Sequence, residues 1–426
     1  MPLRASLFLI ACLAHAQDFA GNPPHPKPAF PRQTNAPKPA KPSPAVSIET
    51  ITTRLNSPFA LAFLPDGNFL VTESAGALRI VRPDGVVFAP LAGLPDVKAV
   101  AAEGLHDVLL DPDFARNRTI YFNYFAPPPG EPAGIWPTEF FYDKVWSTPI
   151  PQRRTMNIGT ERTASAKLSA DNRALTDVTI LAEGVERRIV LAPDGKLLIT
   201  GADQFRYYET DYDGDEHDFT DNPDLRRNYS GRVLRINRDG SIPSDNPWLA
   251  RATVPAALYA HGLRDPEGAA INPATGELWV TDHGPQGGDE INIIRAGKDY
   301  GWPDVSYGTQ YDARRTDGRK NVPVGNGKAS MPGVEEPAYW WIPDIAPSGM
   351  MFYTGNLFPD WRGNLFVGGL EARALVRLVL DKNEVVAEER LLLDQKQSIR
   401  DIRQGPDGAV YLLTRSGSLL KLTPKK

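Results

Sequence analysis

The chain has 426 residues, 41% of them hydrophobic, and a formal net charge of −5. This length and apolar content are enough for a large core, and the 40 prolines and 36 glycines predict many turns. The acidic balance leaves no basic footprint, so binding to nucleic acid is not supported, whereas small neutral or cationic ligands remain open.

Residues 1–16 are predicted to be an export signal. Arg4 gives a positive start, residues 5–13 are apolar, and Ala14-His15-Ala16 places small residues at a cleavage site. Cleavage there predicts a periplasmic or secreted protein. An alternative is a lipoprotein box ending at Cys12, which would leave a lipid anchor. Cys12 is the sole cysteine, so the mature domain is expected to have no disulfide.

Residues 17–46 are predicted to be a disordered linker. They are rich in Pro, Lys, Ala and Asn, which bury little apolar surface and favour extended conformations. The folded domain is expected to span residues 47–426.

One phrase recurs along this domain: an alternating apolar run, a Pro-Asp-Gly-type break and a second alternating run. Its copies begin at Leu61, Asp107, Ile189, Ala269, Met350 and Asp401. Each copy is typical of a β-hairpin, because Asp-Gly tolerates the backbone angles of a tight turn. Units too small to bury their own apolar faces pack radially. We therefore expect an all-β fold, a six-bladed β-propeller of four-stranded antiparallel blades, with few helices and no membrane span.

Two irregular stretches interrupt this pattern. Residues 126–160 are too long for an ordinary hairpin loop, and their aromatic side chains could cover the propeller mouth and stack on a sugar, or pack against a blade edge. Residues 211–218 are acidic around a glycine but lack the twelve-residue spacing of a calcium loop. A solvated surface loop is the favoured interpretation of the second stretch.

Several segments are long and unusual enough to indicate a family. They read EGLHDVLLDPDF, RRIVLAPDGKLLITGADQ, GRVLRINRDGSIPSDNPW, HGLRDPEG, DHGPQGGDEINIIRAGKDYGWPDVSYG, IAPSGMMFYTG and IRDIRQGPDG. In this order they resemble the soluble quinoprotein sugar dehydrogenases, also called the glucose/sorbosone dehydrogenase family. The resemblance implies a six-bladed propeller that oxidises an aldose sugar at its anomeric carbon with pyrroloquinoline quinone and calcium, and then passes electrons to an acceptor.

The resemblance also implies two calcium sites. Gly284 and Pro285 would offer main-chain carbonyls to the calcium that accompanies the cofactor, and oxygen ligands suit that ion. Glu290 and Tyr300 match a separate structural calcium site.

The catalytic positions match only in part. Arg264 matches an arginine that faces the reacting carbonyl, Asp203 an aspartate that orients the catalytic histidine, and Arg400 an arginine near the cofactor. The histidine itself begins an H-x-x-G-R pattern, which in this chain reads Gly184-Val185-Glu186-Arg187-Arg188. Gly184 therefore stands at the position of the general base, and glycine cannot accept a proton.

Other cofactor positions also depart from the family. Glu371 replaces a lysine and Ser398 an arginine, while Ala102 and Tyr208 replace glutamines and Asp265 an asparagine. Lys to Glu changes the charge by two units and Arg to Ser and Asn to Asp by one each, so the pocket becomes four units more negative. Each unfavourable charge pair costs on the order of 1 to 4 kcal/mol, which opposes binding of a cofactor with carboxylates.

Candidate replacements for the base are Glu183, Glu186, His106 and His283. Two main hypotheses follow. The chain is either an exported sugar dehydrogenase with a rearranged site, or a catalytically degenerate propeller that binds a carbohydrate or a protein partner in the same pocket. A purely structural exported module is a third interpretation.

Overall fold

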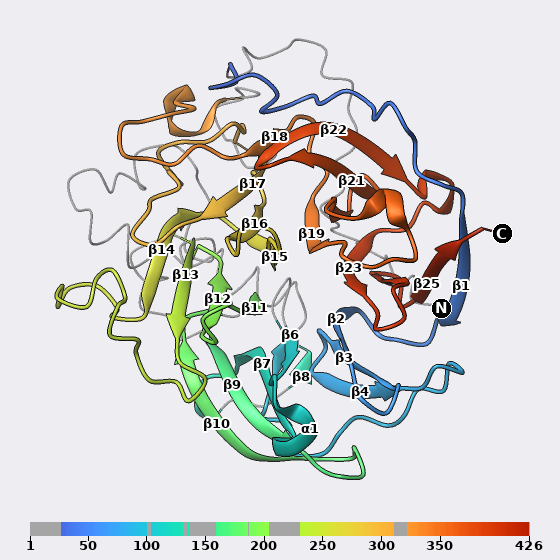
Figure 1. The fold of residues 1–426 in the computed structure, drawn as a ribbon. Coiled ribbons are helices and arrows are strands. Elements are labelled where there is room, and N and C mark those ends of the chain that lie inside the picture. The colour runs from blue at the N-terminus through green and yellow to red at the C-terminus, as the bar shows by residue number, and fades with distance from the viewer. Residues whose placement is uncertain are drawn as a thin grey trace, which may run out of the picture.

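The structure is a computed structural model, and it describes residues 27–99, 104–130, 134–135, 159–185, 187–203, 231–310 and 322–425. Six antiparallel sheets stand like blades around a central axis, with their inner strands toward the middle of the ring (Figure 1). The predicted propeller is confirmed. Outside the described residues lie the predicted signal with Cys12, Ala102, Glu186, Tyr208, the 211–218 loop and most of the 126–160 insertion.

The blades follow one another along the chain, and the strands of each blade are named from the innermost outward. Blade I is β2 (Pro58–Phe63), β3 (Phe69–Glu73) and β4 (Ala77–Val81); blade II is β6 (Leu105–Leu110), β7 (Thr119–Ala126), β9 (Thr160–Leu168) and β10 (Leu175–Glu183). Blade III is β11 (Arg188–Leu191), β12 (Leu197–Gly201), β13 (Gly231–Ile236) and β14 (Leu258–Leu263); blade IV is β15 (Pro266–Ile271), β16 (Leu278–Asp282), β17 (Asp289–Ile294) and β18 (Tyr339–Trp341). Blade V is β19 (Pro347–Phe352), β20 (Leu365–Gly369), β21 (Ala374–Asp381) and β22 (Glu384–Leu391); blade VI is β23 (Ile399–Gln404), β24 (Val410–Thr414), β25 (Leu419–Pro424) and β1 (Val46–Thr52).

Short elements lie in the connections within and between the blades. They are the parallel pair β5 (Lys98–Ala99) and β8 (Gly134–Ile135), the single-turn helix α1 (Phe114–Asn117), and the 3-10 turns η4 (Val324–Gly327), η5 (Pro359–Trp361) and η6 (Leu393–Gln395). None of the helices in the described ranges is long and apolar enough to cross a membrane.

The Pro-Asp-Gly breaks form the same turn in different blades. Between β2 and β3, the Leu64 amide donates to the Asn68 carbonyl, and the Gly67 amide donates back to the Leu64 carbonyl. The Asp66 carboxylate accepts the Asn68 amide, and Gly67 has φ of 85°. The aspartate therefore fixes the turn through its side chain, and the glycine takes the left-handed backbone. The same hydrogen bonds recur in the turns at residues 192–196, 237–241 and 405–409.

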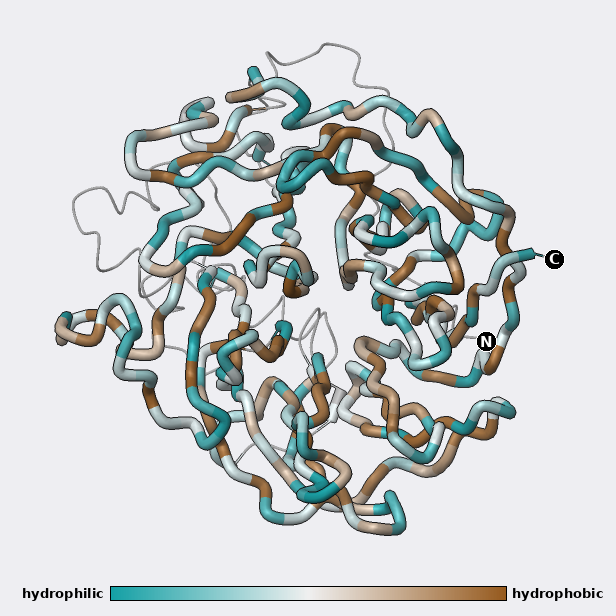
Figure 2. Tube along the Cα trace, in the orientation of Figure 1, coloured by the Kyte–Doolittle hydropathy of each residue, from teal (hydrophilic) through white to brown (hydrophobic). Residues whose placement is uncertain are grey.

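The apolar core lies between the blades. Strands β3, β12, β16, β20 and β24 are buried along their whole length, because each is the second strand of its blade and is covered on both faces. Each cluster of apolar side chains joins neighbouring blades; Phe69 of β3, for example, contacts Tyr411 of β24 with ring centroids 5.5 Å apart. Figure 2 shows the apolar segments along the strands and polar segments at many turns. Interblade packing thus supplies the main stabilisation.

Two features complete the ring. Strand β1 from the N-terminal side pairs with β25 from the C-terminal side, so blade VI joins the two ends of the domain (Figure 1). In blade I the outer position is taken by residues 86–91, where the amides of Phe88 and Leu91 donate to the carbonyls of Ile80 and Leu78 in β4. Within the described residues, blades II to VI therefore have four regular strands each, and blade I has three strands and an irregular edge.

The prediction of a disordered linker is wrong for residues 27–45. This segment, which we call the strap, runs along the outside of blades IV and V before it enters β1 (Figure 1). Gln33 is fully buried; its Nε2 donates to the Pro337 carbonyl over 2.9 Å and its main-chain carbonyl accepts the Trp340 amide over 2.9 Å. Composition describes side chains and does not register main-chain contacts. The unpaired amides and carbonyls of an extended segment can bind an exposed sheet edge whatever its side chains are.

Candidate functional site

Charged side chains of the inner strands β6, β11, β15 and β23 meet at the axis, and five of the six inner strands begin with a register shift. The shifts fall at Pro58/Leu61, Leu105/Val108, Pro266/Gly268, Pro347/Met350 and Ile399/Asp401. A β-bulge bends its strand and re-aims the adjacent side chains. The same local irregularity, repeated around the ring, therefore directs polar residues toward the centre.

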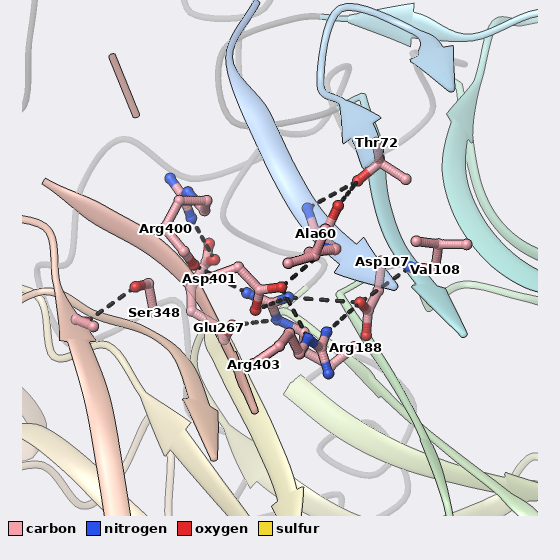
Figure 3. A network of polar contacts seen from close by, with 12 residues as sticks. Ala60, Thr72, Asp107, Val108, Arg188, Glu267, Ser348, Arg400, Asp401 and Arg403 are labelled. Atoms are coloured by element: carbon pink, nitrogen blue, oxygen red, sulfur yellow. Dashed lines mark hydrogen bonds and ion pairs between the residues drawn. The ribbon is translucent and has the colours of Figure 1, made fainter. Parts of the chain in front are cut away.

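A ring of two arginines and two aspartates cross-links the blades (Figure 3). Arg188 Nη1 lies 3.2 Å from Asp401 Oδ1 and 3.6 Å from Asp107 Oδ1. Arg403 contacts the same pair, with Nη2 2.9 Å from Asp107 Oδ1 and Nε 2.9 Å from Asp401 Oδ2. The carboxylates also accept the main-chain amides of Ile189 and Leu61, over 2.9 and 3.1 Å. The ring joins blades I, II, III and VI, so it is part of the scaffold of the site.

A second cluster surrounds Arg187, whose side chain is fully buried. Its Nε and Nη2 each lie 3.2 Å from Asp265 Oδ1, its Nε lies 3.8 Å from Glu267 Oε1, and its Nη1 lies 3.3 Å from His106 Nε2. Arg400 binds Glu267 from the other side, with Nη1 2.8 Å from Oε2. Burial alone would raise the pKa of Glu267, but Arg400 and Arg187 together hold it below its ordinary value.

Arg264 is held at the turn between β14 and β15. The buried Asp282 carboxylate accepts the main-chain amides of Arg264 and Asp265, over 2.8 and 2.6 Å. The Arg264 guanidinium donates through Nη1 to the carbonyls of His283, at 3.0 Å, and Gly284, at 3.2 Å, and lies 5.4 Å from the Trp302 ring. The structure therefore brings the predicted arginine onto the predicted calcium loop.

Asp203, predicted to orient the catalytic histidine, has a different partner. Its carboxylate accepts the indole Nε1 of Trp302 over 2.6 Å, and its main-chain amide donates to the Arg264 carbonyl over 2.7 Å. It supports the wall that carries Arg264.

Two buried carboxylates flank the Gly284–Pro285 loop. Asp289 accepts the amides of Gly284, Ile345 and Ala346, and Asp344 accepts the amide of Gly287 over 2.6 Å. Burial raises the pKa of Asp289, and the negative charge of Asp344 raises it further. The other oxygen of Asp344, Oδ1, is buried without a hydrogen-bond partner among the described residues. Two carboxylates and a carbonyl-rich loop fit a hard cation such as calcium, which would neutralise this excess of negative charge.

Glu290 and Tyr300 lie further out in blade IV. Glu290 pairs directly with Asp282 across β16 and β17, and burial, followed by this like charge, raises the pKa of Glu290 to about 8. The Tyr300 hydroxyl donates to the Ile293 carbonyl and accepts the Arg295 amide. A metal at this position would therefore have to use the main-chain carbonyl of Tyr300. Within the described ranges, no three His, Cys, Asp or Glu side chains are arranged to hold a metal by themselves.

Gly184 lies between β10 and β11 with φ of 77°, and its carbonyl accepts the Arg232 guanidinium over 3.0 Å. A histidine in this backbone conformation would be strained. Of the candidate replacements, Glu183 pairs with Arg162 over 2.9 Å on the exposed side of blade II, away from the axis.

The two candidate histidines are both engaged. The Nε2 of His283 lies 2.5 Å from the Pro347 carbonyl, so it carries a proton and donates. His106 is buried between the Phe59 ring, 4.6 Å away, and Arg187. A guanidinium can only donate, so His106 Nε2 is an acceptor and its proton is on Nδ1.

The cations that could hold an anionic cofactor match the expected set only in part. Glu371 is half-buried, and burial raises its pKa; Ser398 donates to the Leu370 carbonyl over 2.8 Å. Neither supplies positive charge. Three partly exposed arginines at the axis do: Arg264, Arg400 and Arg403. Each guanidinium has five donors in a fixed plane, which suits the carboxylates and carbonyls of a quinone. The resemblance implies two of these arginines, Arg264 and Arg400, and the structure adds Arg403; Arg400 and Arg403 also bind the carboxylates of Glu267, Asp107 and Asp401.

The sequence interpretation missed three residues of this site. Arg187 stands at the glycine of the H-x-x-G-R pattern and returns one positive charge, so the loss counted from the substitutions is overstated by one unit. Glu267 and Arg403 were also missed, although both lie within matched segments. A count of all charges in those segments, beyond the known site positions, would have found them.

Three comparisons place the chain among known proteins. Residues 55–421 match the family model described as glucose/sorbosone dehydrogenase. The aldose sugar dehydrogenase YliI of Escherichia coli is 34% identical over 89% of this chain and 93% of its own length. Quinoprotein glucose dehydrogenase B of Acinetobacter calcoaceticus is 28% identical over 86% of this chain and 84% of its own length. The apo-form crystal structure of the E. coli soluble aldose sugar dehydrogenase superposes with a TM-score of 0.73 at 32% identity, covering 89% of this chain and all of that one.

Proposed function

Because the chain belongs to the glucose/sorbosone dehydrogenase family, we propose that it is an oxidoreductase that oxidises an aldose sugar at the propeller axis. The observation that carries this proposal is the junction of Arg264 with the predicted calcium loop: its guanidinium binds the His283 and Gly284 carbonyls beside the buried carboxylates of Asp289 and Asp344. Burying these carboxylates is costly unless a cation neutralises them, which supports a metal beside Arg264.

In the proposed reaction the protein positions charge. Gly284 and Pro285 would present carbonyls to calcium, with Asp289 and Asp344 behind the loop, and Arg264, Arg400 and Arg403 would hold the anionic cofactor. Pyrroloquinoline quinone, when bound, supplies a two-electron acceptor for the hydride of the anomeric carbon. The Arg264 side chain is already held in place. It would therefore stabilise negative charge on an oxygen of the bound cofactor.

The substrate would be a neutral sugar, and a separate acceptor would take the electrons in turn. We also propose a periplasmic or secreted location, with cleavage after residue 16 or lipidation at Cys12 as the two forms; the export signal in the sequence supports this.

The direct test is reconstitution. Purified protein with calcium is titrated with pyrroloquinoline quinone while its absorbance is followed, and aldoses are then assayed by dye reduction. Saturable quinone binding and chelator-sensitive turnover are expected. The matched variants are Asp344→Asn, which should raise the calcium concentration needed, and Asp360→Asn at the exposed rim, which should not change it.

A second function has its own support. Gly184, Glu371 and Ser398 remove a base and two cations, as expected of a propeller that binds a carbohydrate or a protein without oxidising it. Sugar binding measured by calorimetry, with no quinone bound at any calcium concentration, would favour this function over the first.

A further inference from the structure

Gly184 cannot accept the proton that a histidine at this position would take from the sugar. Among the side chains at the axis, Asp265 is the best placed to accept it. It lies in the turn between β14 and β15, next to Arg264. Its amide donates to Asp282 Oδ1 over 2.6 Å, and its carbonyl accepts the His283 amide over 3.2 Å. The backbone of Asp265 is therefore fixed on both sides before any ligand binds.

Asp265 is also the most accessible carboxylate of its cluster. Its side chain is 21% exposed, whereas those of Glu267 and Asp107 are 6% and 2% exposed. Glu267 is held between Arg187 and Arg400, and Asp107 belongs to the scaffold ring. Of these three carboxylates, that of Asp265 is therefore the most open to a solute at the axis.

Arg187 pairs with the Asp265 carboxylate and fixes its orientation. Its Nε and Nη2 both contact Asp265 Oδ1, and it is fixed in turn by His106 and Glu267. In the H-x-x-G-R pattern the position of Arg187 is a glycine, and Asp265 stands where an asparagine is expected. The two charged residues thus occupy positions that are neutral in the resemblance, and the structure brings them into contact. Arg187 without Asp265, or Asp265 without Arg187, would destabilise the fold more than the pair does, because each residue brings in a charge that the other neutralises.

We propose that Asp265 accepts the proton of the sugar's anomeric hydroxyl, with Arg187 as its positioning residue, in place of the absent histidine. This inference rests on the proposed function. The O–H bond of the anomeric hydroxyl would break and its proton would go to the Asp265 carboxylate; the hydride of the same carbon, with two electrons, would be taken by the quinone as the acceptor. The carbon–oxygen bond becomes a carbonyl, so the aldose leaves as a lactone.

Charged groups face Asp265 from the elements packed against it. Arg187 faces it with positive charge, and Glu267 and Asp282 with negative charge. A carboxylate ordinarily titrates near about 4 and a histidine near about 6.5. Activity that depends on a carboxylate base should therefore stay level through neutral pH and fall only under acidic conditions, whereas a histidine base would give a rising limb near about 6.5.

The test compares Asp265→Asn with the wild type in two measurements. Asparagine keeps the shape and cannot accept the proton, so kcat should fall by about 100- to 10,000-fold. Quinone affinity, read from the absorbance titration, should stay the same or rise because one negative charge is lost. The matched control is Glu183→Gln, a rival carboxylate on the outside of blade II, which should leave both measurements unchanged.

Arg187 is tested by rescue. Arg187→Lys keeps a cation beside Asp265, and Arg187→Met removes it. The lysine variant should retain more kcat than the methionine variant, and Arg187→Met should have little further effect when Asp265→Asn is already present. Circular dichroism shows whether each variant is folded.

The outcomes separate the two proposals. If the wild-type protein binds no quinone, the proposed function is overturned, and this inference with it. If the quinone binds and sugar is oxidised, but Asp265→Asn keeps its kcat and the pH profile rises near about 6.5, the inference alone is overturned.

Discussion

The axis and the rim of this propeller are held by different interactions. At the axis, buried arginines and carboxylates of four blades bind each other, as in the ring of Arg188, Arg403, Asp107 and Asp401. At the rim, the strap binds mainly through backbone groups and neutral side chains, such as Gln33 and Ser43. The main-chain contacts of the strap with the blades do not depend on matched charges. The axis needs matched charges, so a change such as Asp265 requires a partner such as Arg187.

The largest effect should come from breaking the axial ring. Arg188→Met leaves Asp107 and Asp401 buried with one cation fewer, which is expected to lower the free energy of unfolding by about 3 to 5 kcal/mol. Urea unfolding measures this loss. Arg295→Met is the matched control, since Arg295 is half-exposed and its ion pairs should contribute less than about 1 kcal/mol. Equal losses in the two variants would contradict the contrast between axis and rim.

Glu290 lies in blade IV beside Asp282, and it should make the stability of the protein depend on pH. Its pKa is raised from 4.5 to about 8, so the folded protein holds a proton that the unfolded chain releases above about pH 4.5. Stability without metal should therefore fall as the pH rises from about 5 to 8, by on the order of a few kcal/mol. Melting temperatures across this range measure the effect.

Glu290→Gln should flatten this dependence, because glutamine stays neutral throughout. Calcium should also flatten it in the wild type, since it favours the ionised carboxylate. If the metal-free wild-type protein became more stable toward pH 8, another group would already neutralise the ionised Glu290 carboxylate, and this prediction would be wrong.

The strap should detach without unfolding the propeller. Gln33→Ala removes the side chain that accepts the Ala29 amide over 2.7 Å and donates to the Pro337 carbonyl. The expected cost is about 1 to 3 kcal/mol of local stability, because the carbonyl and amide lose their partners. Amide hydrogen exchange should speed up in residues 27–45 and stay slow in β3 and β24. Faster exchange in the core strands would mean that the strap is part of the cooperative fold.

The smallest effect is expected at the edge of the strap. Lys41 pairs with Asp360 over 2.8 Å, and both side chains are exposed. Lys41→Ala should change the free energy of unfolding by only about 0.2 to 1 kcal/mol, and less in high salt. A thermal melt with and without salt checks this.

Much of the fold could be predicted because its signals are local. The Asp-Gly turns, such as Asp66-Gly67, fix hairpins from four or five consecutive residues, and their repetition gives six blades. The linker prediction failed over residues 27–45, because it judged the strap by composition alone. What Gln33 binds is more than 300 positions away in the sequence, where no local pattern can indicate it.

For the site, the sequence by itself determined which expected groups are missing: Gly184 supplies no base, and Glu371 and Ser398 supply no cation, whatever their surroundings. Only the tertiary structure decided what compensates for them. Arg187 and Asp265 are 78 positions apart, and the packing of blades III and IV brings them into contact at 3.2 Å. Coulomb energy depends on distance and burial rather than on sequence separation, so a charge count over the chain could register the changes but could not pair them.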